Sequence, residues 1–386
     1  MTETAERALL PAGMSDVLAP DAAFEAAQLE RLMTWFAGHG YDRVKPPLIE
    51  FETGLLTGMG AGLGGQTFRL MDPVSQKMMG VRADITPQIA RIAGARLRHA
   101  PRPLRLGYAG DVLRVRGTQL RPERQFTQAG VELIGVDAPA ADAEVIVMAA
   151  GALADLGVGG LTVDLGLPTL VPAVLGKAGN DADLLAGLRQ ALDRKDAAAV
   201  ARLGKQLGKD VARVLTALLA AAGPAAKTLQ VLNGLGLGKQ AARERKALAQ
   251  VVDLVRAGAP ALTLTIDPVE NRGFEYHTGV TFTFFAKGVR GELGSGGRYR
   301  AGTEPATGLT LFMDTVLRAL PGPKPVPRVY LPAATPAAAA VKLRAQGWVA
   351  VGGLVDGGAV EKEARRLGCT HVLVKGKARP LKKTKG

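Results

Sequence analysis

Residues 112–135, VLRVRGTQLRPERQFTQAGVELIG, decide the fold of this 386-residue chain. They link two strand-like segments, 103–115 (PLRLGYAGDVLRV) and 126–136 (FTQAGVELIGV), through an arginine-rich connection at 116–124. Apolar residues and the alternation of side chains favour a β-strand for each segment. Because the connection is short, the two strands are expected to pair as neighbours in an antiparallel sheet.

The second of these strands carries two polar side chains on a face that otherwise reads as interior. With a period of two, Phe126, Gln128, Gly130, Glu132 and Ile134 share that face. A buried carboxylate is costly unless it is paired, and a glycine leaves room for a ligand to lie across the strand. The alternative is a solvent-exposed face on which Ile134 is the exception.

Helical and strand patterns alternate around this strand pair. Leu29, Leu32, Met33 and Phe36 repeat with the spacing of one helical face. A short helix is predicted at 86–98, with Thr86 as N-cap and Pro87 at the first helical position. Strands interrupted by long helical stretches, with strand pairs joined by short loops, predict an α+β fold rather than a doubly wound sheet.

Three parts are expected along the chain. Residues 1–320 form a core domain, with a helical insertion at about 177–258 where leucine and valine repeats are separated by glycines. Residues 321–327 (PGPKPVP) mark a proline-rich linker. Residues 328–386 form a small α/β module with a basic tail.

The net charge of +14 is concentrated at the C-terminal end. Residues 321–386 hold 13 Lys/Arg and 3 Asp/Glu, against 36 and 32 in residues 1–320. A basic tail can bind phosphate backbones, and it can equally be a solvated terminus that keeps the protein soluble. The charge alone leaves both interpretations open.

Composition argues against several classes of protein. A single cysteine, Cys369, excludes an intramolecular disulfide and a thiolate metal site, and the four histidines show no metal-ligand spacing. The glycine-rich run 291–302 (GELGSGGRYRAG) matches neither a Walker A nor a dinucleotide fingerprint, so no cofactor is expected. No apolar run is long enough for a membrane helix, and the N-terminus does not look like a signal peptide. We therefore expect a soluble, cytoplasmic protein.

Two further stretches are candidates for ligand binding. In 81–91 (VRADITPQIAR), Asp84 and Thr86 can point the same way off an extended segment and hold an ammonium group, or they can simply cap a helix. In 270–280 (ENRGFEYHTGV), an arginine, a tyrosine and a histidine cluster before a strand. These can grip a carboxylate and a planar polar ligand, or can be solvated charges around a turn.

Taken in order, these stretches resemble the catalytic core of a class II aminoacyl-tRNA synthetase of the histidyl type, over about residues 8–320. Residues 40–50 (GYDRVKPPLIE) resemble the first motif, a dimer-interface element, including Pro47. Residues 112–135 resemble the second motif, with Arg114 as its arginine, and 272–277 (RGFEYH) resembles the histidine-specific signature. The resemblance implies an antiparallel sheet flanked by helices.

Departures from the synthetase pattern fall mainly on the nucleotide side. Arg116 stands where the second motif has a glutamate, and Thr315 stands where the third motif has an ATP-contacting arginine. Asp84 replaces a glutamate, and His277 replaces the second tyrosine of the signature. Losing a cation that neutralises phosphate removes charge stabilisation. The pattern is similar to the regulatory subunits of ATP phosphoribosyltransferase, paralogues that do not aminoacylate tRNA.

That resemblance implies a histidine site without catalytic residues. Asp84, Thr86 and Gln128 would face the α-ammonium group, Arg272 the carboxylate, and Glu132 with His277 the imidazole. Tyr276 and Tyr299 would line the pocket, beside Arg114.

The implied partner is a short-form ATP phosphoribosyltransferase catalytic subunit, bound by a homodimer of this chain within a hetero-oligomer, with histidine as feedback effector. Binding to tRNA or to a membrane is not expected. The alternatives are a working histidyl-tRNA synthetase, in which a residue such as Arg318 supplies the missing cation, and a tRNA-binding paralogue. The C-terminal module faintly resembles a shortened anticodon-binding domain, and its role stays open.

Overall fold

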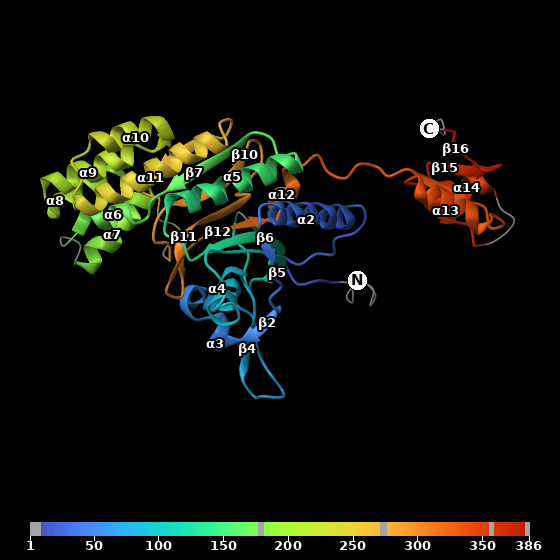
Figure 1. The fold of residues 1–386 in the computed structure, drawn as a ribbon, viewed down its shortest axis with the longest axis horizontal. Helices are drawn as coiled ribbons and strands as arrows, with labels where there is room; N and C mark the ends of the chain where they lie inside the picture. The colour runs from blue at the N-terminus through green and yellow to red at the C-terminus, as the bar shows by residue number, and fades with distance from the viewer. Residues whose placement is uncertain (1–8, 120, 177–180, 271–275, 355–358, 383–386) are drawn as a thin grey trace. The chain divides into compact units, whose positions relative to one another are not determined.

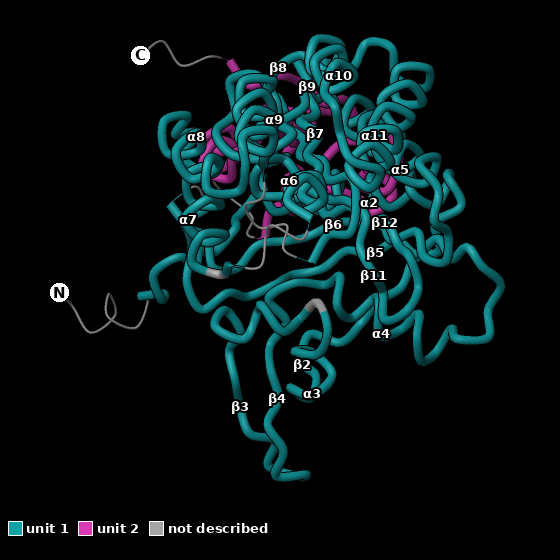
Figure 2. The backbone as a smooth tube through the Cα atoms, turned by 90° about the vertical axis from the view of Figure 1, so that its left-hand side faces the viewer, with its two compact units in different colours: residues 1–322 teal, residues 323–386 magenta. Residues whose placement is uncertain are grey.

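A nine-stranded sheet organises the first of two compact units, which span Met1–Gly322 and Pro323–Gly386 (Figures 1 and 2). The computed structural model describes residues 9–119, 121–176, 181–270, 276–354 and 359–382. The strands of the large sheet follow in spatial order: β1 (Asp42–Arg43), β5 (Leu104–Leu113), β6 (Gln125–Ile134), β12 (Glu304–Phe312), β11 (Gly294–Ala301), β10 (Thr281–Ala286), β7 (Leu161–Gly166), β9 (Thr263–Asp267) and β8 (Gly223–Pro224).

Antiparallel pairing dominates this sheet, as the sequence predicts. β5 and β6 pair over their whole length, from Leu104 opposite Ile134 to Leu113 opposite Gln125. Two pairs are parallel, β1 with β5 and β7 with β9. The second needs a long crossover, which the helical insertion between β7 and β9 supplies. The prolines at 46 and 47 follow β1, which lies at the sheet edge where a missing N–H costs no ladder bond.

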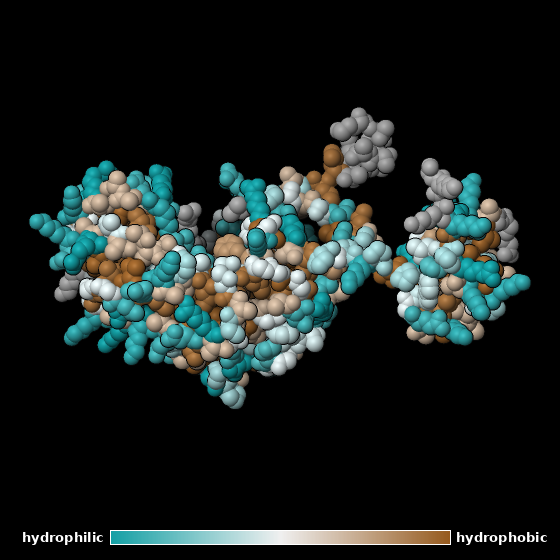
Figure 3. Space-filling view, turned by 90° about the horizontal axis from the view of Figure 1, so that it is seen from above, coloured by the Kyte–Doolittle hydropathy of each residue, from teal (hydrophilic) through white to brown (hydrophobic). Residues whose placement is uncertain are grey.

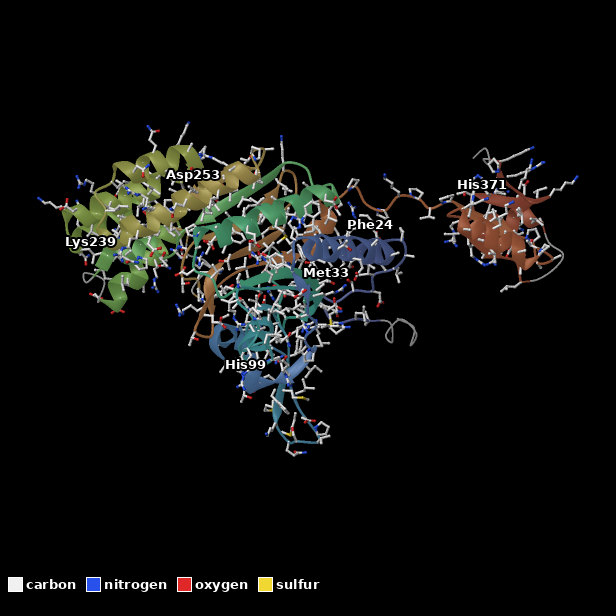
Figure 4. All side chains as sticks on the ribbon, viewed as in Figure 1. Phe24, Met33, His99, Lys239, Asp253 and His371 are labelled. Carbon is white, nitrogen blue, oxygen red and sulfur yellow. The ribbon has the colours of Figure 1, made fainter. Side chains whose placement is uncertain are left out.

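One face of the sheet is covered by α2 (Asp21–Gly38) and α5 (Pro139–Leu156). The predicted stripe on α2 is confirmed, because Leu32, Met33 and Phe36 are buried and Leu29 packs against the same cluster. Met33, labelled in Figure 4, reaches Gly107 of β5, where an added Cβ would lie 3.6 Å from its Cε atom. This is the larger of the two cores in unit 1.

The opposite face carries a smaller core beneath α4 (Thr86–Ala95). The expected helix at 86–98 ends three residues early, and Thr86 is its first helical residue rather than its N-cap, which is Ile85. The physical reason is that the Thr86 hydroxyl lies 3.2 Å from the Tyr108 hydroxyl instead of bonding to its own helix. Around α4 lie α3 (Glu52–Leu55), η1 (Gly58–Gln66) and a three-stranded sheet of β2 (Ile49–Phe51), β4 (Met78–Val81) and β3 (Arg69–Met71).

The helical insertion forms the yellow-green part of Figure 1. Asp181 and Asp196 cap two of its helices by accepting hydrogen bonds from backbone N–H groups. Its longest helix packs against α5, and α12 follows β12. The helices of the insertion are α6 (Leu170–Leu175), α7 (Ala182–Asp193), α8 (Ala197–Gln206), α9 (Lys209–Ala220), α10 (Ala225–Gly234) and α11 (Lys239–Gly258), whereas α12 (Met313–Arg318) lies outside it.

Unit 2 is a four-stranded sheet with one helix packed on each face. Its last strand is not anticipated by the sequence, because KARP (377–380) reads as part of a basic tail. Lys375 and Gly376 both have positive φ, which suits the two-residue turn that joins the last two strands. The elements are β13 (Arg328–Leu331), α13 (Ala337–Ala345), β14 (Val349–Gly352), α14 (Val360–Arg366), β15 (His371–Val374) and β16 (Lys377–Pro380).

In the part of the chain that the structure describes, no helix combines the length and the apolarity needed to cross a bilayer.

Candidate functional site

Polar side chains gather on the sheet face that lies under the first turn of α4. They come from β5, β6, β11 and β12, which the antiparallel ladders bring side by side, and from the segment that leads into α4. Most of the sequence-predicted site residues lie here, although the positions from Asp84 to Tyr299 span more than 200 residues of the chain. The site therefore depends on long-range strand pairing.

Glu132 is the most buried carboxylate of this group, with no exposed surface. The Tyr299 hydroxyl donates to its Oε2 atom at 2.7 Å, and the Tyr108 hydroxyl donates to its Oε1 atom at 3.4 Å. Gly308, opposite in β12, makes this possible, because a Cβ there would lie 1.7 Å from Oε2. Burial raises the pKa of Glu132 to about 8, while the tyrosine hydrogen bonds act to lower it. Such a group favours a hydrogen-bond donor that also carries positive charge.

Asp84 and Gln128 form the other polar end of the site. The Gln128 Nε2 atom donates to Asp84 Oδ2 at 2.9 Å, and its Oε1 atom accepts the Ile85 N–H at 3.1 Å. The Asp84 Oδ1 atom accepts the Thr86 N–H at 2.9 Å. Asp84 thus serves both interpretations of the sequence, since one oxygen steadies the start of α4 and the other belongs to the polar cluster.

Tyr108 joins the two ends, and sequence reasoning missed it. Its hydroxyl lies 3.2 Å from Thr86 Oγ1 and 2.7 Å from Thr310 Oγ1. Burial raises the pKa of Tyr108 and of Tyr299 well above the ordinary value, so both remain protonated donors. The signal was present in the sequence, because a tyrosine on the interior face of a strand needs a partner for its hydroxyl.

The aromatic residues after the 270–275 segment approach the same carboxylate. Tyr276 and His277 stack with ring centroids 4.1 Å apart, and Tyr276 meets Tyr299 edge to face at 6.4 Å. His277 is buried. The structure therefore brings Tyr276 beside Tyr299 and close enough to feel the charge of Glu132, with His277 stacked on Tyr276, while Arg272 lies outside the described residues.

Arg114 borders the Asp84 end. Its Nη2 atom lies 4.0 Å from Asp84 Oδ2, its Nε atom donates to the Ala83 carbonyl at 3.3 Å, and its guanidinium lies 5.1 Å from the Phe126 ring centroid. Burial lowers the pKa of Arg114, while the charge of Asp84 raises it. Arg114 thus lies next to Asp84, another residue predicted for the same site.

Thr315 stands where the third motif of a synthetase has an ATP-contacting arginine, and the neighbouring Arg318 is not available to take over that role. Thr315 accepts a hydrogen bond from Arg318 Nη2 at 3.0 Å, and Arg318 also lies 3.6 Å from Glu123 and 3.5 Å from Asp314. Arg318, the residue that could have restored the charge, is thus engaged by two carboxylates. Among the described residues, no cluster of three or more His, Cys, Asp or Glu side chains could hold a metal ion.

A large groove of unit 1 lies on the other face of the sheet, over α5. It has a volume of about 1290 Å³ and is lined by apolar residues such as Val147, Leu254 and Phe285. Figure 3 looks down on the side that carries α2, α5 and α11, and apolar colours gather there between hydrophilic margins. Few polar groups converge in this groove, so the polar cluster under α4 is the better candidate for small-molecule recognition.

Comparison with known proteins identifies the family. The family model described as histidyl-tRNA synthetase matches residues 13–316. Over 374 residues the chain is 62% identical to the ATP phosphoribosyltransferase regulatory subunit of Paramagnetospirillum magneticum, covering 97% of this chain and 98% of the relative. The chain belongs to the family of ATP phosphoribosyltransferase regulatory subunits. Members of this family are regulatory and not catalytic subunits, which confirms the expectation drawn from the missing nucleotide-binding cation.

Solved structures support the same fold for this regulatory subunit. A Bacillus halodurans protein described as an ATP phosphoribosyltransferase regulatory subunit/histidyl-tRNA synthetase superimposes with a TM-score of 0.81 at 25% identity, covering 93% of this chain and 96% of that one. The histidyl-tRNA synthetase of Nostoc sp. PCC 7120 superimposes with a TM-score of 0.77 at 16% identity, covering 95% and 91%. The predicted class II synthetase-like fold is confirmed.

Proposed function

We propose that the chain assembles with a short-form ATP phosphoribosyltransferase catalytic subunit, supports the first step of histidine biosynthesis, and binds histidine as a feedback effector under α4. The catalytic partner follows from the names of the relatives. The observation that carries the effector is the buried Glu132 carboxylate, held by two tyrosine hydroxyls on the same strand face as Gln128, which in turn donates a hydrogen bond to Asp84.

The two ends of this cluster suit the two ends of histidine. A free amino acid offers an ammonium group, which suits the Asp84 carboxylate and the Gln128 carbonyl oxygen. Its imidazole ring offers N–H donors and can carry a positive charge, which suits Glu132. The stacked Tyr276 and His277 rings supply a flat wall for a planar ring near Tyr299.

Feedback requires that histidine bind the inhibited assembly more tightly than the active one. Both ends of the polar cluster contact the first turn of α4: Asp84 accepts the Thr86 N–H, and Tyr108, which binds Glu132, lies beside the Thr86 hydroxyl. A bound amino acid could therefore shift that helix. The test is to titrate histidine into the isolated chain by calorimetry and into the reconstituted complex by turnover. Absence of binding to both would overturn the effector assignment.

We also propose that a second copy of the chain covers the outer face of the β2–β4–β3 sheet. The strand register puts five apolar side chains on that face and the polar Glu50 on the other, where it binds Arg91. Ile49 and Phe51 remain 38% and 43% exposed. An apolar patch of this kind marks an interaction surface, and residues 40–50 resemble a dimer-interface motif. The five residues are Ile49, Phe51, Leu70, Met79 and Val81.

A further inference from the structure

Arg121, in the connection between β5 and β6, lies in a corner formed by two aromatic rings. The rings of Phe126 and Phe312 have centroids 6.1 Å apart and planes inclined by 71°. The Arg121 guanidinium carbon lies 3.8 Å from the Phe312 centroid and 4.9 Å from the Phe126 centroid, and the residue is only 8% exposed. A planar cation thus fills this aromatic corner (Phe126 and Phe312).

Two hydrogen bonds fix the guanidinium in the corner. Its Nε atom donates to Asp314 Oδ2 at 3.2 Å, and its Nη2 atom donates to Thr315 Oγ1 at 3.5 Å. The backbone is fixed too, because the Arg121 N–H donates to Thr118 Oγ1 at 3.0 Å and its carbonyl accepts the Thr118 N–H at 2.6 Å. The side chain is therefore held from both ends.

The surroundings of the corner do not suit an anion. Arg318 is shared between Glu123 and Asp314. One buried oxygen on each of these two carboxylates accepts no hydrogen bond within the described residues. Unfilled acceptors repel phosphate oxygens, and the three cations of the cluster are matched by three carboxylates. The cations are Arg114, Arg121 and Arg318, and the carboxylates are Glu123, Glu292 and Asp314.

The corner adjoins the proposed histidine site. Phe126 lies two residues before Gln128 on the same face of β6, and Phe312 is the register partner of Gln128. Arg114 contacts both regions, since it lies over the Phe126 ring and near Asp84. A ligand that extended beyond the amino acid along this face would meet Arg121.

We propose that Arg121 is a built-in plug that excludes purine nucleosides and nucleotides from the aromatic corner, so that the neighbouring site takes a free amino acid alone. This inference rests on the proposed function only for the identity of that amino acid. The ring faces are what a planar base would stack on, and the guanidinium already covers them. Nucleotide-bearing ligands are thereby excluded in two ways. The Arg121 guanidinium covers the rings on which a base would stack, and the cations that could attract phosphate are already paired with carboxylates.

The test uses adenosine, which is uncharged and carries the planar base alone. Calorimetric titration of the full-length chain should show only weak adenosine binding, whereas Arg121→Ala should bind it about 10- to 100-fold more tightly than the wild type. Arg121→Met keeps the corner filled without charge, and Arg318→Ala removes a neighbouring cation without opening the corner. Neither control should gain adenosine affinity.

Two results would overturn the proposal: wild-type binding of adenosine as tight as that of Arg121→Ala, or no gain in a folded Arg121→Ala protein. Thermal unfolding verifies the fold. If the unpaired Asp314 prevents folding, the double variant Arg121→Ala, Asp314→Asn removes that buried charge and takes the place of the single variant. Titration of the same samples with histidine keeps the two proposals separate, because loss of histidine binding to all of them would refute the effector and leave the adenosine result standing.

Discussion

Replacing Glu132 with glutamine tests the candidate site most selectively, because it removes the ability to ionise and keeps the shape. The side chain has no exposed surface, and its two oxygens accept hydrogen bonds from Tyr299 at 2.7 Å and Tyr108 at 3.4 Å. An amide keeps one acceptor oxygen for Tyr299. It cannot pair with a charged imidazole ring. We therefore expect Glu132→Gln to fold and to bind histidine more weakly.

The expected magnitude follows from the chemistry of the lost contact. A hydrogen bond to a charged group contributes about 1.5–3 kcal/mol, and 1.4 kcal/mol corresponds to a factor of ten in affinity. The dissociation constant of histidine should therefore rise about 10- to 150-fold. Isothermal titration calorimetry measures it. Glu304→Gln serves as control, because Glu304 pairs with Arg102 at the end of the same sheet and does not touch the cluster.

An unchanged dissociation constant in a folded Glu132→Gln protein would remove Glu132 from the histidine site. An equal loss in Glu304→Gln would show that the effect is a general consequence of losing a carboxylate. Only a loss confined to Glu132→Gln agrees with the proposed site.

Three other predictions concern stability and assembly. Because burial raises the pKa of Glu132 from 4.5 to about 8, the folded state favours the neutral form, and the associated stability is present below pH 4.5 and lost as the pH rises to 8. Urea unfolding should therefore show a free energy that falls more steeply with pH in the wild type than in Glu132→Gln, by about 1.4 kcal/mol per unit between pH 5 and 7; parallel profiles would contradict it. Phe51→Lys should turn the homodimer into monomers in light scattering, whereas Val231→Lys on α10, an equally exposed site, should leave it intact. Gly308→Ala should cost about 1–3 kcal/mol in thermal unfolding and abolish histidine binding, since the new methyl group overlaps Glu132, whereas Gly234→Ala meets no neighbour and should do neither.

Local patterns in the sequence were enough to predict the elements that carry the site. The alternation in residues 126–134 placed Gln128 and Glu132 on one strand face, and the structure buries both. The i, i+3, i+4, i+7 spacing of Leu29 to Phe36 identified the buried side of α2. Each of these features is encoded within about ten residues, so a single sequence can reveal it.

Features that depend on pairing between strands far apart in the chain could not be predicted from the sequence. Tyr108 and Thr310 belong to strands 200 positions apart, and their hydroxyls meet only because both strands pair with β6. In the sequence, Arg121 is one of several arginines in a loop and has no distinguishing pattern. Its contacts with Phe126 and Phe312 require β6 and β12 to lie side by side. Thr86 is offered by the sequence both as the cap of α4 and as a site residue; the structure places Ile85 at the cap, and the Thr86 hydroxyl lies beside the Tyr108 hydroxyl.

The measurement that tests the central claim most directly is turnover of a short-form ATP phosphoribosyltransferase mixed with this chain, with and without histidine. We expect turnover to depend on the chain, to fall as histidine is added, and to become insensitive to histidine when the chain carries Glu132→Gln. An assembled complex whose turnover is the same at every histidine concentration would contradict the claim that the polar cluster under α4 is a regulatory histidine site.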